Sequence, residues 1–175
     1  ALLMLNIGST RVARNDLANG LQDYAEARRI REATGTFETA DGAVLLMHIG
    51  VAKRAGRRYD AALRAYAEAR SIRQLTNTLN TADGALLLNC IGAAKFDSED
   101  AEGSLEAYLE SRRIREKTGM LETPDGALLL MNIGVGKRAC GDFTGALKAY
   151  TESRGIRERM GSLKTPDGAN LLNSI

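Results

Sequence analysis

A unit of 42 residues repeats four times along this chain, and no other feature of the sequence constrains the fold as strongly. The dipeptide Ile-Gly ends an apolar run at Gly8, Gly50, Gly92 and Gly134, with no insertion between copies. Of the 42 columns, 13 hold the same residue in all four copies, which chance does not produce. A fixed period of this length indicates stacked units, each of which buries its apolar face against its neighbours.

The repeats account for the chain from end to end. We place complete copies at 1–42, 43–84, 85–126 and 127–168, and the start of a fifth copy at 169–175. Because the sequence starts and stops inside a unit, we expect this single array to be part of a longer one.

The first half of each unit carries the signals of a helix. At 123–126, Thr123 can cap the first amides, Pro124 suits the first helical position and Asp125 lies in the first turn, near the positive helix end. About fourteen residues later a polar break ends this first helix.

A second helix follows the break. Its apolar positions recur at spacings of three and four, as at Phe143, Ala146, Leu147, Tyr150 and Ser153. The candidate caps are Asp16, Asp100 and Asp142, and the expected ends are Gly35, Asn77, Gly119 and Gly161. Ala, Leu, Arg and Glu dominate the composition, which favours helix over sheet. The predicted fold is therefore all-α, an α-solenoid of helical pairs.

The repeat resembles the tetratricopeptide (TPR) signature of leucine-glycine, turn glycine, aromatic, alanine and aromatic. In the fourth copy these positions are Ile133, Gly134, Gly141, Phe143, Ala146 and Tyr150. The long unit, with Pro-Asp-Gly-Ala opening the first helix and Asn-Ile-Gly inside it, looks most like the repeats of kinesin light chains, which recognise cargo peptides. This resemblance implies a right-handed superhelix whose first helices line a concave groove for a peptide.

The chain departs from the TPR pattern at two positions. The turn glycine is replaced in three copies by Asn15, Arg57 and Glu99, and a cation stands where the family often has tyrosine. Those cations are Arg11, Lys53, Lys95 and Lys137. The unit is also roughly eight residues longer than the usual TPR, so we expect longer helices and a longer connection.

The apolar run of the first helix is wider than one face. At about 100° per residue, Leu129, Leu130, Gly134 and Lys137 point toward the second helix. A second, half-apolar face remains, which either packs on adjacent repeats or contacts a partner. The resemblance implies the groove, with these candidate residues: Asn6, Val44, Met47, His48, Val51, Arg54, Leu86, Asn89, Cys90, Ala93, Phe96, Leu128, Met131, Asn132, Val135 and Arg138.

Four of these candidates are polar and can donate and accept hydrogen bonds at once. Asn6, His48, Asn89 and Asn132 therefore suit the amide groups of a peptide backbone. The alternative is a satisfied hydrogen bond between neighbouring helices.

Two arginine columns lie on the inward stripe of the second helix. The structural interpretation packs their stems on apolar neighbours and pairs the guanidinium groups with helix-end carbonyls or with a repeated aspartate. The residues concerned are Arg28, Arg31, Asp41, Arg70, Arg73, Asp83, Arg112, Arg115, Asp125, Arg154, Arg157 and Asp167. The alternative is a basic ladder for an acidic peptide. A glutamate column about 160° away, Glu26, Glu68, Glu110 and Glu152, is expected to be the solvated face.

Several function classes find no support in the residues. The net charge is +2 with both signs interspersed, which argues against nucleic acid as a partner, and no apolar run approaches the ~18 residues of a membrane insertion. Cys90 and Cys140 are expected to be free thiols, and the single histidine, His48, lacks the companions of a metal site. We expect no metal, no cofactor and no catalytic site. Two cysteines of this kind are typical of a reducing compartment, so we expect an intracellular, cytoplasmic protein.

Three hypotheses of function follow. The leading one is a non-enzymatic protein–protein interaction scaffold that binds a peptide of a partner in the groove. A second is a structural spacer or assembly subunit that works through its convex face or its ends, including end-to-end self-association. A third is a regulatory part of a larger multidomain protein.

Overall fold

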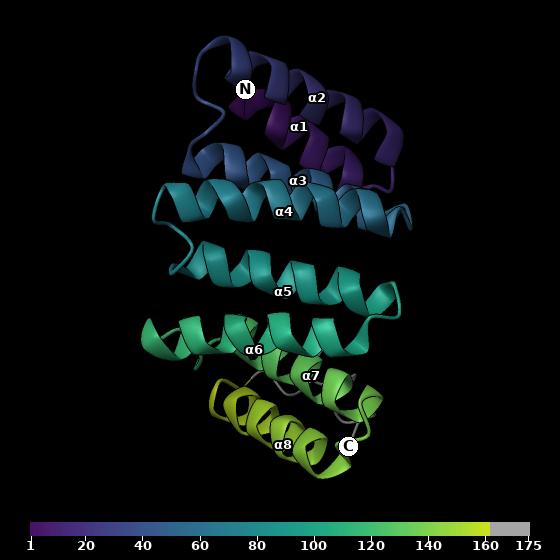
Figure 1. Cartoon of the computed structure of the whole chain (residues 1–175), viewed down its shortest axis with the longest axis vertical. Helices are drawn as coiled ribbons and strands as arrows, with labels where there is room; N and C mark the ends of the chain where they lie inside the picture. The colour runs from purple at the N-terminus through teal and green to yellow at the C-terminus, as the bar shows by residue number, and fades with distance from the viewer. Residues whose placement is uncertain (162–175) are drawn as a thin grey trace.

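The computed structural model describes residues 1–161, which form eight α-helices arranged as four consecutive pairs (Figure 1). The first helices of the pairs are α1 (Leu2–Ala13), α3 (Ala40–Ala55), α5 (Ala82–Asp97) and α7 (Pro124–Ala139). The second helices are α2 (Leu17–Ala33), α4 (Tyr59–Leu75), α6 (Ala101–Lys117) and α8 (Phe143–Arg159). The pairs stack in chain order, as predicted for an all-α solenoid. The partial fifth repeat at 169–175 lies outside the described residues.

Threonine side chains cap the N-termini of three of the first helices. Thr39, Thr81 and Thr123 each accept a hydrogen bond from the amide of the glycine three residues later. Pro124 occupies the first turn of α7. These local contacts satisfy backbone donors that the helix itself cannot use, so the predicted helix starts are confirmed.

The second helices begin at aspartates, with one exception. Asp16, Asp100 and Asp142 accept hydrogen bonds from amides in the first turns of α2, α6 and α8. At α4 the same position is Arg58, whose side chain makes no capping hydrogen bond.

The tight turn within each repeat keeps one geometry although its residue changes. Asn15, Arg57, Glu99 and Gly141 have φ of 64°, 58°, 69° and 81°, all in the left-handed region. The departure from glycine in three copies therefore leaves the turn intact. The predicted ends of the second helices also have positive φ, at Gly35, Asn77, Gly119 and Gly161.

A tyrosine of each second helix lies on the backbone of the first helix in the same repeat. At Gly92, an added Cβ would come within 2.5 Å of the ring of Tyr108, which explains why this position holds glycine. The equivalent pairs are Gly8 with Tyr24, Gly50 with Tyr66 and Gly134 with Tyr150.

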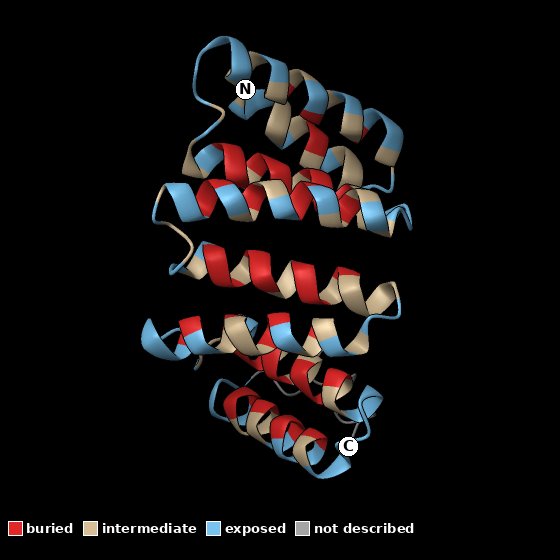
Figure 2. Cartoon of the chain, viewed as in Figure 1, coloured by how far each residue is buried: buried red, intermediate tan, exposed pale blue. Residues whose placement is uncertain are grey.

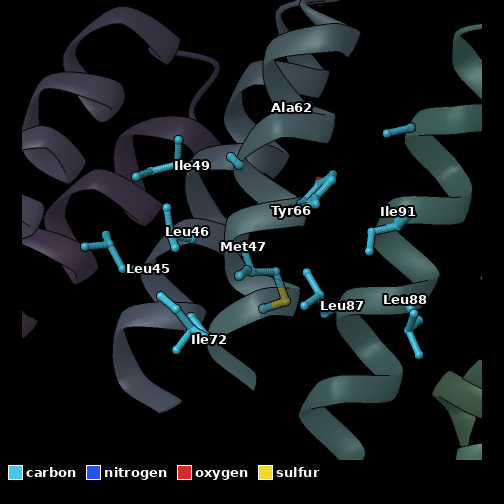
Figure 3. Close-up of a cluster of buried hydrophobic side chains, with 14 of the residues drawn as sticks. Leu45, Leu46, Met47, Ile49, Ala62, Tyr66, Ile72, Leu87, Leu88 and Ile91 are labelled. Carbon is cyan, nitrogen blue, oxygen red and sulfur yellow. The ribbon is translucent and has the colours of Figure 1, made fainter. Parts of the chain in front are cut away.

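The core consists of apolar clusters that follow one another along the stack, and buried residues lie in both helix layers (Figure 2). Leu45, Leu87 and Leu129, one column of the repeat, are completely buried. Figure 3 shows how leucine and isoleucine side chains of α3, α4 and α5 gather in one cluster. Each repeat thus buries its apolar face only with help from its neighbours.

Two residues of the predicted apolar stripe on α8 are exposed. Phe143 and Leu147 are 67% and 51% exposed. Leu105, the equivalent of Leu147 in the preceding repeat, is half-buried and lies 3.6 Å from where a Cβ of Gly136 on α7 would be. The stripe therefore packs on the next repeat. Within residues 1–161, no further helix follows α8.

The first helices form the inner layer of the solenoid. Neighbouring first helices touch one another at α1 and α3, at α3 and α5, and at α5 and α7. The second helices contact mainly the first helices that lie before and after them. We expect the layer whose members approach one another to lie on the inside of a curved stack, which would place the candidate groove residues on the concave side.

Candidate functional site

The candidate groove residues are mostly half-buried, between the core and solvent. The half-buried members are Val44, His48, Arg54, Leu86, Asn89, Cys90, Ala93, Phe96, Leu128, Met131, Asn132 and Val135. Asn6, Val51 and Arg138 are exposed.

Met47 differs from the other candidates because it is buried. Its exposed fraction is 8%, and it belongs to the same apolar cluster as Leu46 and Leu87 (Figure 3). Here the first helix of the next repeat covers the side chain, so Met47 supports the packing of α3 on α5.

A cavity of about 380 Å³ lies where α3, α5 and α7 come together, with one wall contributed by α6. It brings together eight of the candidate groove residues, which are Arg54, Asn89, Cys90, Ala93, Phe96, Leu128, Asn132 and Val135. Asp97 and Tyr108 complete the lining. Residues from three successive repeats therefore converge on one hollow.

Sequence reasoning missed two of the lining residues. Asp97 is the only charged member of a column that otherwise holds Ala13, Ala55 and Ala139, and this irregularity was the available signal. Tyr108 is the equivalent of Tyr150 on the apolar stripe of the second helix; it is 4% exposed and also lines the cavity.

The charged part of the cavity is one ion pair between repeats. Arg54 Nε donates to Asp97 Oδ2 at 2.6 Å. Burial opposes the charge on Arg54, but the hydrogen bond to Asp97 and the charge of this carboxylate outweigh it, so the pKa of Arg54 is raised. The pair therefore places two opposite charges beside the apolar and amide side chains that line the rest of the cavity.

The remaining titratable groups of the cavity are uncharged at neutral pH. Burial raises the pKa of the Cys90 thiol to about 11. Burial also raises the pKa of the Tyr108 hydroxyl to about 12. Cys90 is therefore a neutral thiol and a poor nucleophile at neutral pH.

The amide groups of Asn89 and Asn132 meet in this cavity. Asn132 Nδ2 donates to Asn89 Oδ1 at 3.0 Å across the α5–α7 contact. Of the two alternatives for the polar groove residues, Asn89 and Asn132 follow the second, a hydrogen bond between neighbouring helices. Each primary amide has two N–H donors and two acceptor lone pairs, so one mutual bond leaves capacity to engage a peptide backbone.

His48 belongs to a short polar chain near the N-terminal end of the inner layer. Its Nδ1 lies 3.4 Å from Ser9 Oγ, which in turn lies 3.1 Å from the hydroxyl of Tyr24. Burial lowers the pKa of His48, so the ring is neutral at pH 7. This histidine links α1, α2 and α3 and remains half-buried on the groove face.

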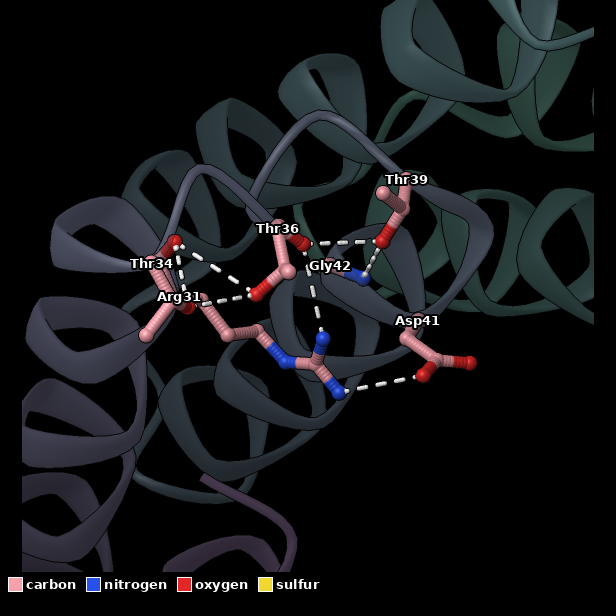
Figure 4. Close-up of polar contacts among 6 residues, drawn as sticks. All are labelled: Arg31, Thr34, Thr36, Thr39, Asp41 and Gly42. Atoms are coloured by element: carbon pink, nitrogen blue, oxygen red, sulfur yellow. Dashed lines mark hydrogen bonds and ion pairs between the residues drawn. The ribbon is translucent and has the colours of Figure 1, made fainter.

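The buried arginine column pairs with the repeated aspartates. Arg31 Nη2 lies 3.3 Å from Asp41 Oδ2, and its other terminal nitrogen donates to the carbonyl of Thr36 in the connection between repeats (Figure 4). Arg73 with Asp83 at 3.6 Å, and Arg115 with Asp125 at 3.8 Å, repeat the arrangement. Arg157 is buried in the same way, and Asp167 lies outside the described residues.

The other arginine column pairs with glutamates of the following repeat. Arg28 donates to Glu68 at 2.8 and 3.2 Å, an arrangement that recurs between Arg70 and Glu110 and between Arg112 and Glu152. We call these three contacts the Arg–Glu ladder.

The ladder corrects the expectation that the glutamate column is only a solvated face. Neighbouring second helices have similar orientations. One side of each helix therefore faces the opposite side of the next one. A glutamate about 160° from the arginine on its own helix therefore points back at the arginine of the preceding repeat. Glu26, in the first repeat, instead pairs with Arg29 of its own helix.

Residues 1–161 offer little for other chemistry. Within them, no group of three or more His, Cys, Asp or Glu side chains could hold a metal ion, and both cysteines are free. None of the helices described is long and apolar enough to cross a membrane.

Solved structures of similar architecture exist, although no protein-family model and no curated protein matches the sequence significantly. BtubC (BKLC) from P. vanneervenii superposes with a TM-score of 0.83 at 19% identity, over 90% of this chain and 63% of BtubC. This chain thus spans less than two thirds of that protein. TPR-like repeats of a Podosopora anserina protein described as a kinesin light chain give 0.82 at 12% identity, over 98% of this chain and 81% of the other.

The apo form of RapI gives a TM-score of 0.71 at 17% identity, over 98% of this chain and 45% of RapI. At these identities the likeness concerns the fold. The chain has the TPR-like solenoid fold that the repeat pattern predicted.

Proposed function

We propose that this chain is a non-enzymatic protein–protein interaction scaffold that binds an extended peptide of a partner along the concave face of α1, α3, α5 and α7. The observation that carries this proposal is the cavity of about 380 Å³ shared by three repeats. A hollow with an apolar lining and a few convergent polar groups is typical of a binding site.

The lining divides into parts that suit different groups of a peptide. Phe96, Leu128 and Val135 form an apolar surface that can contact one side chain of the peptide. Next to it, the Asn89–Asn132 pair can donate hydrogen bonds to the peptide backbone and accept hydrogen bonds from it. The Arg54–Asp97 pair provides both charges at the same site, so it can select against a neutral or wrongly charged neighbour in the peptide.

The test begins with peptides selected on the wild-type chain from a random phage-displayed library. The affinity of each selected peptide is then measured by fluorescence polarisation against the double variant Asn89→Ala/Asn132→Ala. We expect affinity to fall about tenfold or more, since two backbone hydrogen bonds are lost. Stability should change little, because removing both partners of a hydrogen bond leaves no unpaired buried amide.

The matched control is the double variant Glu106→Ala/Arg113→Ala, which truncates two exposed side chains of α6, in the outer layer. It should bind the peptides like the wild type. Equal affinity of the wild type and the Asn89→Ala/Asn132→Ala variant for every selected peptide would refute the groove as the binding surface.

A further inference from the structure

Cations without a counter-ion gather around the turn between α3 and α4. The turns within the repeats lie along one edge of the stack (Figure 1). In the fourth repeat, the lysine before this turn pairs with the aspartate that caps the second helix, Lys137 with Asp142 at 3.0 Å. In the second repeat the capping position is Arg58, and Lys53 makes no ion pair with any residue in 1–161. The substitution thus replaces the expected partner of Lys53 by a second cation.

Three exposed arginines near Lys53 also lack a partner. Arg57 and Arg58 lie in the turn, and Arg64 lies in the second turn of α4. Among the residues described, none of the three side chains makes an ion pair or a hydrogen bond. Burial lowers the pKa of Lys53, and the charges of Arg58 and Arg64 lower it further. The chain itself therefore does not compensate the repulsion among these cations.

The three arginines line an open cavity of about 570 Å³ between the α3–α4 turn and the α5–α6 turn. Two carboxylates of its lining, Asp60 and Glu99, are unpaired, whereas Asp97 already pairs with Arg54 at 2.6 Å. The cations therefore outnumber the free carboxylates, and the surroundings carry net positive charge. The cavity shares only Asp97 with the groove cavity. Its complete lining is Arg57, Arg58, Tyr59, Asp60, Ala61, Arg64, Asp97, Ser98 and Glu99.

A free backbone donor belongs to the same lining. In α6 and α8, the amides of Gly103 and Gly145 donate to the capping aspartates at 2.9 and 2.8 Å. The equivalent amide of α4 is that of Ala61, which makes no hydrogen bond within the described part of the chain, because Arg58 offers no acceptor. Guanidinium groups together with a free backbone amide are donors that proteins use to bind oxyanions.

We propose that this cavity binds a phosphate group, either of free inorganic phosphate or of a phosphorylated side chain. The guanidinium groups of Arg57, Arg58 and Arg64 donate to the phosphate oxygens. The amide of Ala61 adds a backbone donor, and Lys53 adds a further positive charge. A phosphate group carries about two negative charges at pH 7 and has more acceptor oxygens than a carboxylate, so it matches the excess of cations better. The site does not depend on peptide binding in the groove.

NMR titration of the whole ¹⁵N-labelled chain with inorganic phosphate, at constant ionic strength, tests the proposal. We expect saturable shifts of the amide signals of residues 57–61, largest at Ala61, whose N–H donates directly. A parallel titration uses the peptide Gly-Gly-phosphoserine-Gly-Gly and its unphosphorylated form. Tighter binding of the phosphopeptide would assign the site to a phosphorylated partner, and tighter binding of inorganic phosphate to the free ion. Saturable shifts at this site with neither probe would overturn the proposal.

The variant Arg58→Asp removes one cation and restores the aspartate of the other second helices, so the fold is kept while the amide of Ala61 becomes occupied. We expect affinity for the better-binding probe to fall about tenfold or more. The matched control Arg113→Asp makes the same charge change at an exposed position of α6 and should bind like the wild type. Unchanged affinity in Arg58→Asp, or an equal loss in the control, would overturn the proposal.

Discussion

At the scale of single residues, small side chains decide how closely the two layers approach. The tyrosine ring of each second helix contacts a glycine of the first helix in the same repeat. A methyl group at this glycine would occupy the space of the ring, and both backbones would have to move apart.

Two glycines of α7 allow this to be measured within one helix. In Gly134→Ala the added Cβ would lie 2.3 Å from the ring of Tyr150, so we expect the free energy of unfolding to fall by about 2 kcal/mol. In Gly136→Ala the nearest atom is 3.6 Å away, and the helix gains about 0.5–1 kcal/mol from replacing glycine. Urea unfolding measures whether the free energy of unfolding falls in Gly134→Ala and rises in Gly136→Ala. Equal effects at the two positions would show that the tyrosine contact does not limit the packing.

At the scale of the element, α4 is the one second helix among those described that lacks an aspartate cap. In α6 and α8 the capping Asp100 and Asp142 also pair with Lys95 and Lys137, at 3.4 and 3.0 Å. At α4 the capping position is Arg58. Burial lowers the pKa of Lys53, and the nearby charges of Arg58 and Arg64 lower it further.

Restoring the aspartate should therefore stabilise α4. We expect Arg58→Asp to raise the free energy of unfolding by about 1 kcal/mol, since it caps the helix and gives Lys53 a partner. The pKa of Lys53 should rise as well, which NMR titration of the side chain can follow. Arg64→Glu is the control: it makes the same change of charge near Lys53 without capping a helix and should change stability by less than about 0.5 kcal/mol. If Arg58→Asp and Arg64→Glu raised the free energy of unfolding equally, the gain would come from reduced repulsion of Lys53 rather than from capping.

At the scale of the whole molecule, stability is distributed along the stack. Within residues 1–161, repeats in the middle contact a neighbour on both sides, whereas the first repeat contacts one. The effect on burial is large: Gly8 is the only buried residue of α1, while α3 and α5 each bury a run of leucine, isoleucine and alanine side chains.

Hydrogen exchange should therefore proceed from the N-terminal end inward. We expect the amides of α1 to exchange at least about tenfold faster than those of α3 and α5, because α1 can detach without unfolding the rest. Mass spectrometry of exchanged peptides resolves these segments. Equal protection of α1, α3 and α5 would instead show that the array opens only as one cooperative unit.

The sequence alone determined those features that depend on residues close together in the chain. The repeat period, the threonine and aspartate caps and the glycine or asparagine ends of the second helices were predicted, because each is set by hydrogen bonds or backbone angles within a few residues. Helical periodicity also gathers the candidate groove residues on one face of the first helices, and their role in binding stays a prediction.

The tertiary structure alone decided what depends on the distance and angle between repeats. Periodicity within one helix does not tell which residues the next repeat covers, and so it placed Met47 in the groove although α5 buries it. For the same reason it missed Asp97 beside Arg54 and the glutamates that face the arginines of the preceding repeat. These contacts join residues about 40 positions apart, and their existence follows from how the helical pairs stack.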